Sequence, residues 1–200
     1  SDAALAAYPE FGCTGKPQQV RTSAGQLPGA EANFCAGKEQ TFAFLQDVLQ
    51  EVMQLFPSTY IHIGGDEVDK KCWENCNLCQ QRMKTEGLKN VKELQSYFIK
   101  RMGKFITGKG RKMIGWDEIL EGGLAPNATV MSWRGEKGGI EAAKMQHDVV
   151  MTPAKTLYFN RYQADTIAYK QPLAAKFSIN TIKKVYDYNP IPVELNSSDA

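Results

Sequence analysis

Short apolar runs alternate along this chain with segments of helical periodicity, and this alternation limits the folds that the chain can adopt. The runs rich in β-forming residues are 59–63, 112–116, 129–133 and 148–152. The segments with one apolar helical face are 38–56, 93–107 and the stretch around 138–146. Alternation of the two patterns is typical of a parallel α/β protein rather than of a sandwich or a helical bundle. We therefore predict four strands in βα register.

The remainder of the chain adds one predicted helix, and no strand is predicted after it. Residues 173–187 have a helical pattern, and the closing segment "YNPIPVELNSSDA" is rich in Pro, Ser and Asn. With 42% hydrophobic residues in a length of 200, the chain can bury a substantial core. We expect residues 1–200 to form a single domain.

Charge and hydropathy argue against two kinds of partner. Lys plus Arg number 24 and Asp plus Glu number 22, without a run of five or six like charges, so no nucleic acid is expected. No apolar run approaches the roughly 18 to 20 residues of a membrane span, and the start lacks a basic segment followed by an apolar core. These residues predict a soluble protein and leave its compartment open.

Three predicted strands end in acidic or aromatic residues, within the motifs "HIGGDE", "IGWDE" and "MSWRG". In parallel α/β barrels, the active site lies at the carboxyl ends of the strands and is assembled from several βα loops. The side chains expected to share one pocket are Asp66, Glu67, Trp116, Asp117, Glu118, Trp133 and Arg134.

The adjacent carboxylates Asp66 and Glu67 are the strongest candidates for catalysis. Two glycines precede them, which lets the chain leave pleated geometry and lets a ligand approach the backbone. Neighbouring carboxylates repel, so one keeps its proton to higher pH and can act as a general acid. This suits acetal cleavage, and indoles at two other strand ends offer flat walls for a sugar ring. The ordinary alternative is a helix N-cap with a solvated first turn.

These motifs carry a family resemblance. "HIGGDEV" resembles the signature of glycoside hydrolase family 20, the β-N-acetylhexosaminidases, and "IGWDEIL", "VMSWRG" and "TLYFNRYQ" resemble its later barrel strands in the same order. "AALAAYPEFGCTG" resembles the segment just after the family's third strand, so the resemblance covers essentially the whole chain. It implies a partial TIM (β/α)8 barrel, with about strands 4 to 7 and their helices.

The resemblance also implies a reaction. Terminal non-reducing β-linked N-acetylglucosamine or N-acetylgalactosamine would be hydrolysed by a substrate-assisted retaining mechanism, in which the sugar's acetamido oxygen is the nucleophile. Glu67 would protonate the glycosidic oxygen and later activate water. Asp66 would hold the acetamido N–H and stabilise the oxazolinium-like intermediate, and Tyr158 would hydrogen-bond the acetamido oxygen. The partner would be an N-acetylhexosamine-containing glycan or glycoconjugate, the location periplasmic or secreted, and no cofactor or metal is implied.

The further candidates for substrate binding are Trp116, Trp133, Asn160, His62, Asp117 and Glu118. The two tryptophans match pocket indoles, and His62 matches a strand histidine that supports the acids. Asn160 stands where the family usually has an aspartate that binds the sugar's outer hydroxyls, and an amide donates as well as accepts. His62 and Tyr158 also have ordinary interpretations, as a satisfied core histidine and a strand-end tyrosine.

The resemblance is to only part of a barrel. The family's first-strand arginine, third-strand histidine motif and eighth-strand tryptophan and acid have no counterpart in this sequence. Four parallel strands cannot close a barrel, and their open edges and uncovered apolar face favour pairing with another copy. We expect self-association and weak or absent activity of this piece. A carbohydrate-binding remnant without turnover is the second functional hypothesis.

The cysteines suggest a rival chemistry. They number five, Cys13, Cys35, Cys72, Cys76 and Cys79, and do not form a tidy disulfide framework. The last three have the C-x3-C-x2-C spacing with which radical S-adenosylmethionine enzymes hold an iron–sulfur cluster. However, Leu78 stands where those enzymes have an aromatic residue. The cysteines could instead bind zinc with a fourth ligand, or form one disulfide with a cysteine left over, and either arrangement would fasten the loop after the acids.

Overall fold

The computed structural model describes residues 2–20, 31, 33–164 and 175–195. Its centre is a four-stranded parallel sheet in the order β1-β2-β3-β4. The strands are β1 (Tyr60–His62), β2 (Lys112–Trp116), β3 (Thr129–Ser132) and β4 (Val149–Met151). Each predicted run therefore forms a strand, and the predicted βα register is confirmed.

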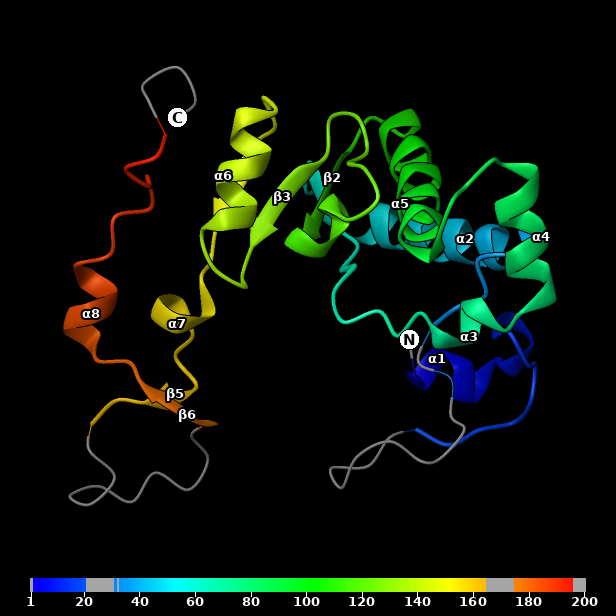
Figure 1. Cartoon of the computed structure of the whole chain (residues 1–200), viewed down its shortest axis with the longest axis horizontal. Coiled ribbons are helices and arrows are strands. Elements are labelled where there is room, and N and C mark those ends of the chain that lie inside the picture. The colour runs from blue at the N-terminus through cyan, green and yellow to red at the C-terminus, as the bar shows by residue number, and fades with distance from the viewer. Residues whose placement is uncertain (1, 21–30, 32, 165–174, 196–200) are drawn as a thin grey trace.

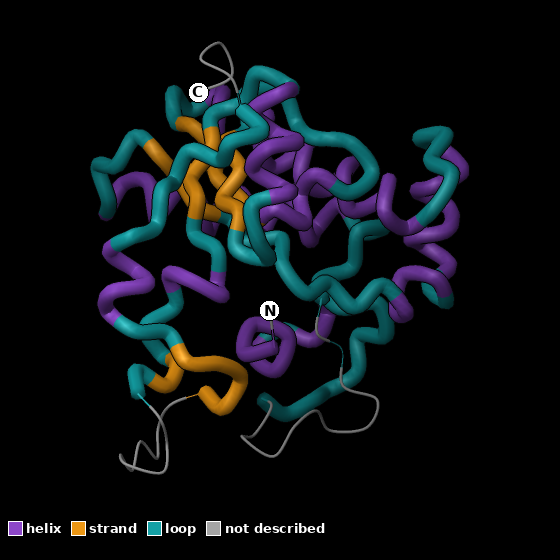
Figure 2. The backbone as a smooth tube through the Cα atoms, turned by 60° about the vertical axis from the view of Figure 1, so that its left-hand side comes forward, coloured by secondary structure: helices purple, strands orange, loops and turns teal. Residues whose placement is uncertain are grey.

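Three amphipathic helices pack against one face of this sheet (Figures 1 and 2). They are α2 (Glu39–Leu55), α5 (Val91–Gly108) and α6 (Lys137–Lys144). Ile61 pairs with Met113, and Val130 pairs with Gly115, two residues further along β2. Side chains in strands alternate between the two faces, so residues 61, 113 and 130 all point to the same side. These three side chains are buried in one core with Met53 of α2 and Ile99 of α5.

The opposite face of the sheet carries the strand residues nearest to the acids. His62, Trp116 and Met131 alternate with the core residues and therefore share this second face. Two other members of the face, Tyr60 and Val150, are exposed although they are large and apolar. The sheet thus buries one face against helices and leaves the other largely uncovered within the described part of the chain.

A second, smaller core lies beside the first, near the N-terminal segment (Figure 1). The short elements around it are α1 (Asp2–Ala7), the 3-10 turn η1 (Pro9–Phe11), α3 (Lys71–Glu74) and α4 (Asn77–Thr85). Trp73 is buried there, and its indole N–H donates to the carbonyl oxygen of Phe34 at 2.9 Å. This core connects the segment before α2 to the elements that follow the acids.

The helix predicted over 173–187 is wrong in its first half. Ala175–Ile179 form strand β6, which pairs in parallel with β5 (Arg161–Tyr162), and residues 173 and 174 lie outside the described part. The helix α8 covers only Ile182–Tyr186, because the hydroxyl of Thr181 accepts the backbone N–H of Lys184 and starts it there. The remaining elements are the 3-10 turn η2 (Asp117–Leu120) and α7 (Ala154–Leu157).

Candidate active site

Asp66 and Glu67 follow β1 after a turn that only unusual backbone geometry can make. Gly64 and Gly65 have φ of +74° and +98°, and Glu67 itself has φ of +48°. Glycine adopts positive φ freely, whereas a glutamate there is strained. A Cβ on Gly65 would lie 2.7 Å from Cγ2 of Ile119, so this glycine is also needed for packing. Both carboxylates are exposed, so the turn presents them rather than buries them.

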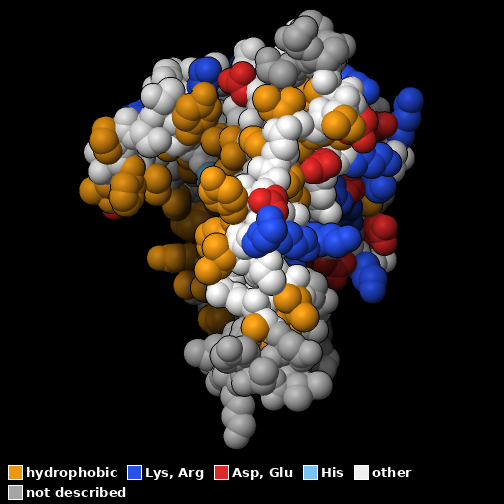
Figure 3. Space-filling view, turned by 90° about the vertical axis from the view of Figure 1, so that its left-hand side faces the viewer, with side chains coloured by type: hydrophobic (Ala, Val, Ile, Leu, Met, Phe, Trp, Pro, Cys, Tyr) orange, Lys and Arg blue, Asp and Glu red, His pale blue; other side chains and the backbone are white. Residues whose placement is uncertain are grey.

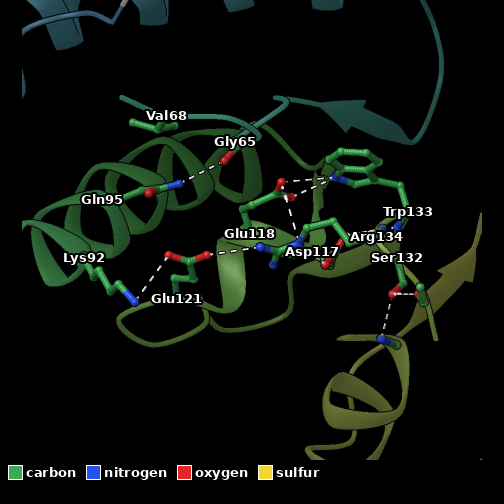
Figure 4. Close-up of polar contacts among 12 residues, drawn as sticks. Gly65, Val68, Lys92, Gln95, Asp117, Glu118, Glu121, Ser132, Trp133 and Arg134 are labelled. Carbon is green, nitrogen blue, oxygen red and sulfur yellow. Dashed lines mark hydrogen bonds and ion pairs between the residues drawn. The ribbon is translucent and has the colours of Figure 1, made fainter. Parts of the chain in front are cut away.

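Two side chains hold this turn in place. Nδ1 of His62 accepts the backbone N–H of Gly64 at 3.0 Å. Nε2 of Gln95 donates to the carbonyl oxygen of Gly65 at 2.9 Å (Figure 4). Gln95 belongs to α5 and is only 2% exposed, so its amide N–H reaches the turn from within the core. Gln95 was not expected from the sequence. The sequence feature that could have indicated this role is a glutamine beside the apolar face of that helix.

The end of β2 contributes Trp116 on the same face as His62. Their ring centroids are 4.8 Å apart, with the planes at 61°. Burial lowers the pKa of His62, and the Asp66 carboxylate opposes this by raising it. His62 therefore lies within the electrostatic reach of the acids and links the turn of β1 to the indole of β2.

Asp117 and Glu118 lie in η2 directly after Trp116 and are buried, at 3% and 7% exposure. Asp117 accepts the backbone N–H of Trp133 at 3.0 Å and the guanidinium Nε of Arg134 at 2.7 Å (Figure 4). Glu118 accepts the indole N–H of Trp133 at 2.9 Å. Burial raises the pKa of Glu118, and the bond from Trp133 opposes the rise. These two acids fasten the end of β3 to the end of β2.

Tyr158, just after α7, completes the group of aromatic side chains. Its ring stacks on Trp133 with centroids 6.3 Å apart and planes at 18°. Burial raises the pKa of the Tyr158 phenol, and the negative charge of Asp66 raises it further. Asp66 therefore acts electrostatically on both Tyr158 and His62, which belong to different strand ends. Asn160, two residues beyond Tyr158, is exposed.

Of the residues expected to share a pocket, Asp117 and Glu118 bond Trp133, and Trp116 contacts His62. Arg134 contacts this group through Asp117, and its guanidinium also pairs with Glu121 at 3.3 Å. Ser132 was not expected: its hydroxyl donates to the carbonyl oxygen of Gly135 at 2.7 Å and accepts the N–H of Gly139 at 2.9 Å. It therefore shapes the loop between β3 and α6.

Parallel strands with acids and indoles at their carboxyl ends are the arrangement of a βα-barrel enzyme. The sequence model described as "Glycosyl hydrolase family 20, catalytic domain" matches residues 1–200, and the chain belongs to this family. The radical S-adenosylmethionine hypothesis is therefore wrong.

No described helix is long and apolar enough to span a membrane.

Curated relatives are named for one activity. The chain is 52% identical over 195 residues to a beta-hexosaminidase of Porphyromonas gingivalis, with 96% of the chain and 24% of that protein covered. It is 34% identical over 160 residues to a beta-hexosaminidase of Vibrio furnissii, with 80% and 26% covered. The chain spans about a quarter of the length of these relatives.

Solved structures agree on the fold. The beta-N-acetylhexosaminidase of Bacteroides fragilis superposes with a TM-score of 0.76 at 32% identity, covering 98% of this chain and 38% of that one. A beta-hexosaminidase mutant of Streptomyces plicatus, solved with GlcNAc, shares the fold with a TM-score of 0.71 at 23% identity, covering 95% and 34%. The expected partial TIM barrel is confirmed.

Proposed function

We propose that residues 1–200 are the central piece of a longer β-N-acetylhexosaminidase barrel. The substrate would be a glycan or glycoconjugate that ends in β-linked N-acetylglucosamine or N-acetylgalactosamine. The observation that carries this proposal is the turn at 64–67, which exposes Asp66 and Glu67 and places Asp66 within electrostatic reach of His62 and Tyr158, two side chains that contact Trp116 and Trp133. Family membership and the names of the relatives support it.

In the proposed reaction, the acetamido oxygen of the substrate attacks its own anomeric carbon while the glycosidic bond breaks. Glu67 gives its proton to the leaving oxygen, then takes one from the water that opens the oxazolinium-like intermediate. Asp66 accepts the acetamido N–H and offsets the positive charge on that intermediate. The hydroxyl of Tyr158 donates to the acetamido oxygen. Burial and the charge of Asp66 raise the pKa of Tyr158, which keeps this donor protonated.

The remaining candidates fall into two groups. Trp116 and Trp133 would form the apolar walls of the sugar pocket, and Asn160 would bind an outer hydroxyl. We assign Asp117 and Glu118 to positioning Trp133, because both are buried and bonded to its N–H groups. The sequence motif predicts that these two acids contact the sugar directly. Their burial favours the positioning role instead.

Dependence on the acetamido group tests the substrate-assisted mechanism. The longer protein should cleave an aryl β-N-acetylglucosaminide at least about 10³-fold faster than the matching aryl β-glucoside, because only the former supplies an intramolecular nucleophile. The measurement is kcat/KM for both substrates under the same conditions. Equal rates would contradict the mechanism, and binding of N-acetylglucosamine without turnover would favour the carbohydrate-binding remnant.

We further propose that the 200-residue chain alone self-associates. Within the described part, β1 and β4 are the outer strands of the main sheet, and Tyr60 and Val150 are exposed on its uncovered face. Figure 3 shows further apolar side chains gathered on one side of the molecule. Elsewhere in the described part, Phe159 and Tyr186 are also exposed. Analytical ultracentrifugation should find dimers or larger species, and a purely monomeric profile would contradict the proposal.

A further inference from the structure

Four of the five cysteines converge outside the candidate active site. Cys13 and Cys35 come from the segment before α2, Cys76 immediately precedes α4, and Cys79 lies within it. Their sulfur atoms all lie within 4.8 Å of one another. All five cysteines are free, and Cys72, which the sequence grouped with Cys76 and Cys79, is not part of this group.

Three of the six sulfur separations match those of a tetrahedral metal site, and the other three are at most 4.8 Å. The measured distances are 3.8 Å between Cys13 and Cys79, and 3.7 Å from Cys35 to both Cys76 and Cys79. Four thiolates at the usual zinc–sulfur distance of about 2.3 Å lie about 3.8 Å apart around a tetrahedron. The C-x2-C spacing of Cys76 and Cys79 is also common in structural zinc sites.

The backbone around the sulfurs is built for close approach. Cys35 and Cys79 have no exposed surface. A Cβ on Gly37 would lie 2.3 Å from the carbonyl carbon of Leu78, so only glycine lets the loop of Cys35 pack on the start of α4.

We propose that Cys13, Cys35, Cys76 and Cys79 bind one structural zinc ion as thiolates. Each thiol releases its proton on binding, and four protein ligands leave no open position for a substrate. The ion ties the N-terminal segment to α4 within the second core. Val68, the residue after Glu67, packs against the same core, so the zinc site anchors the loop that follows the acids.

Metal analysis of the chain, purified with zinc in the medium, tests this proposal. We expect elemental mass spectrometry to find about one zinc ion per chain. Cys79→Ser and Cys35→Ser should lower this content at least tenfold, whereas the matched control Cys72→Ser should retain it. In the native wild-type protein, a thiol-alkylating reagent should label Cys72 alone. After denaturation with a chelator and without reductant, it should label all five cysteines.

A serine variant that fails to fold does not leave the site untested. Wild-type protein can be titrated with a mercurial in the presence of a zinc-sensitive dye, and release of about one zinc ion still supports the site. Less than about a tenth of an ion per chain would overturn the proposal. So would iron as the bound metal, or incomplete labelling after denaturation, which would reveal a disulfide.

Discussion

Replacing Glu67 with glutamine is expected to lower kcat/KM of the longer protein about 10²- to 10⁴-fold, the usual contribution of a general acid. Glutamine has nearly the same shape but has no acidic proton to give to the leaving oxygen. The side chain of Glu67 is exposed, so the change removes little packing and the protein should remain folded. The measurement is steady-state hydrolysis of β-N-acetylglucosaminides, with circular dichroism as the check on folding.

The leaving group supplies a second test of the role of Glu67. A nitrophenolate leaves readily without a proton, whereas the alkoxide of a sugar does not. The loss caused by Glu67→Gln should therefore be larger for a disaccharide than for a nitrophenyl glycoside. Asp69→Asn is the matched control, since Asp69 is an exposed carboxylate two residues further along the same loop. Equal losses for both substrates, or an unchanged rate, would contradict general acid catalysis by Glu67.

The central sheet could be predicted from the sequence because the apolar patterns of its strands differ from those of its helices. Strand β3 (Thr129–Ser132) is a short, largely buried run that begins with two β-branched residues, and helices such as α2 repeat apolar residues on one face. The segment 173–187 has a helical pattern, but Ala175–Ile179 form strand β6. Its outcome depends on pairing of β6 with β5, a contact between segments that neither one specifies alone.

The site could be predicted only as a set of strand ends. Parallel strands bring their carboxyl ends to one edge, so Trp116 and Trp133 were expected near the acids. The sequence did not indicate that Glu118 would turn inward to bond the indole of Trp133, because burial depends on tertiary packing. The same limit applies to the cysteines. The pair Cys76 and Cys79 is recognisable by spacing, but Cys35 joins them from 41 residues away.

The position of the acids is set by neighbours from several elements rather than by the turn alone. His62 and Gln95 bond the two glycines before the acids, and Val68 after them packs against the second core. A left-handed glutamate persists only when its surroundings determine it. The strained turn at Glu67 is therefore held on both sides, which fits a site that must keep a carboxylate in fixed geometry.

Asp66 offers the second large effect, because its proposed role is electrostatic. Asp66→Asn should lower kcat of the longer protein for N-acetylglucosaminides by about 10²- to 10³-fold, the cost of removing one group that stabilises developing charge. Asparagine keeps the shape of the side chain and can still accept an acetamido N–H through its amide oxygen. It carries no negative charge, so the oxazolinium-like intermediate loses its counterion.

The pKa of His62 provides a readout of the same variant that is independent of turnover. The Asp66 carboxylate raises this pKa against the effect of burial, so Asp66→Asn should lower it. The 200-residue chain has only two histidines, so an NMR titration of that chain can follow the His62 imidazole with little overlap. A lower pKa of His62 with a lower kcat would support the proposed role. A lower pKa with unchanged kcat would show that Asp66 exerts its field on the site without stabilising the intermediate.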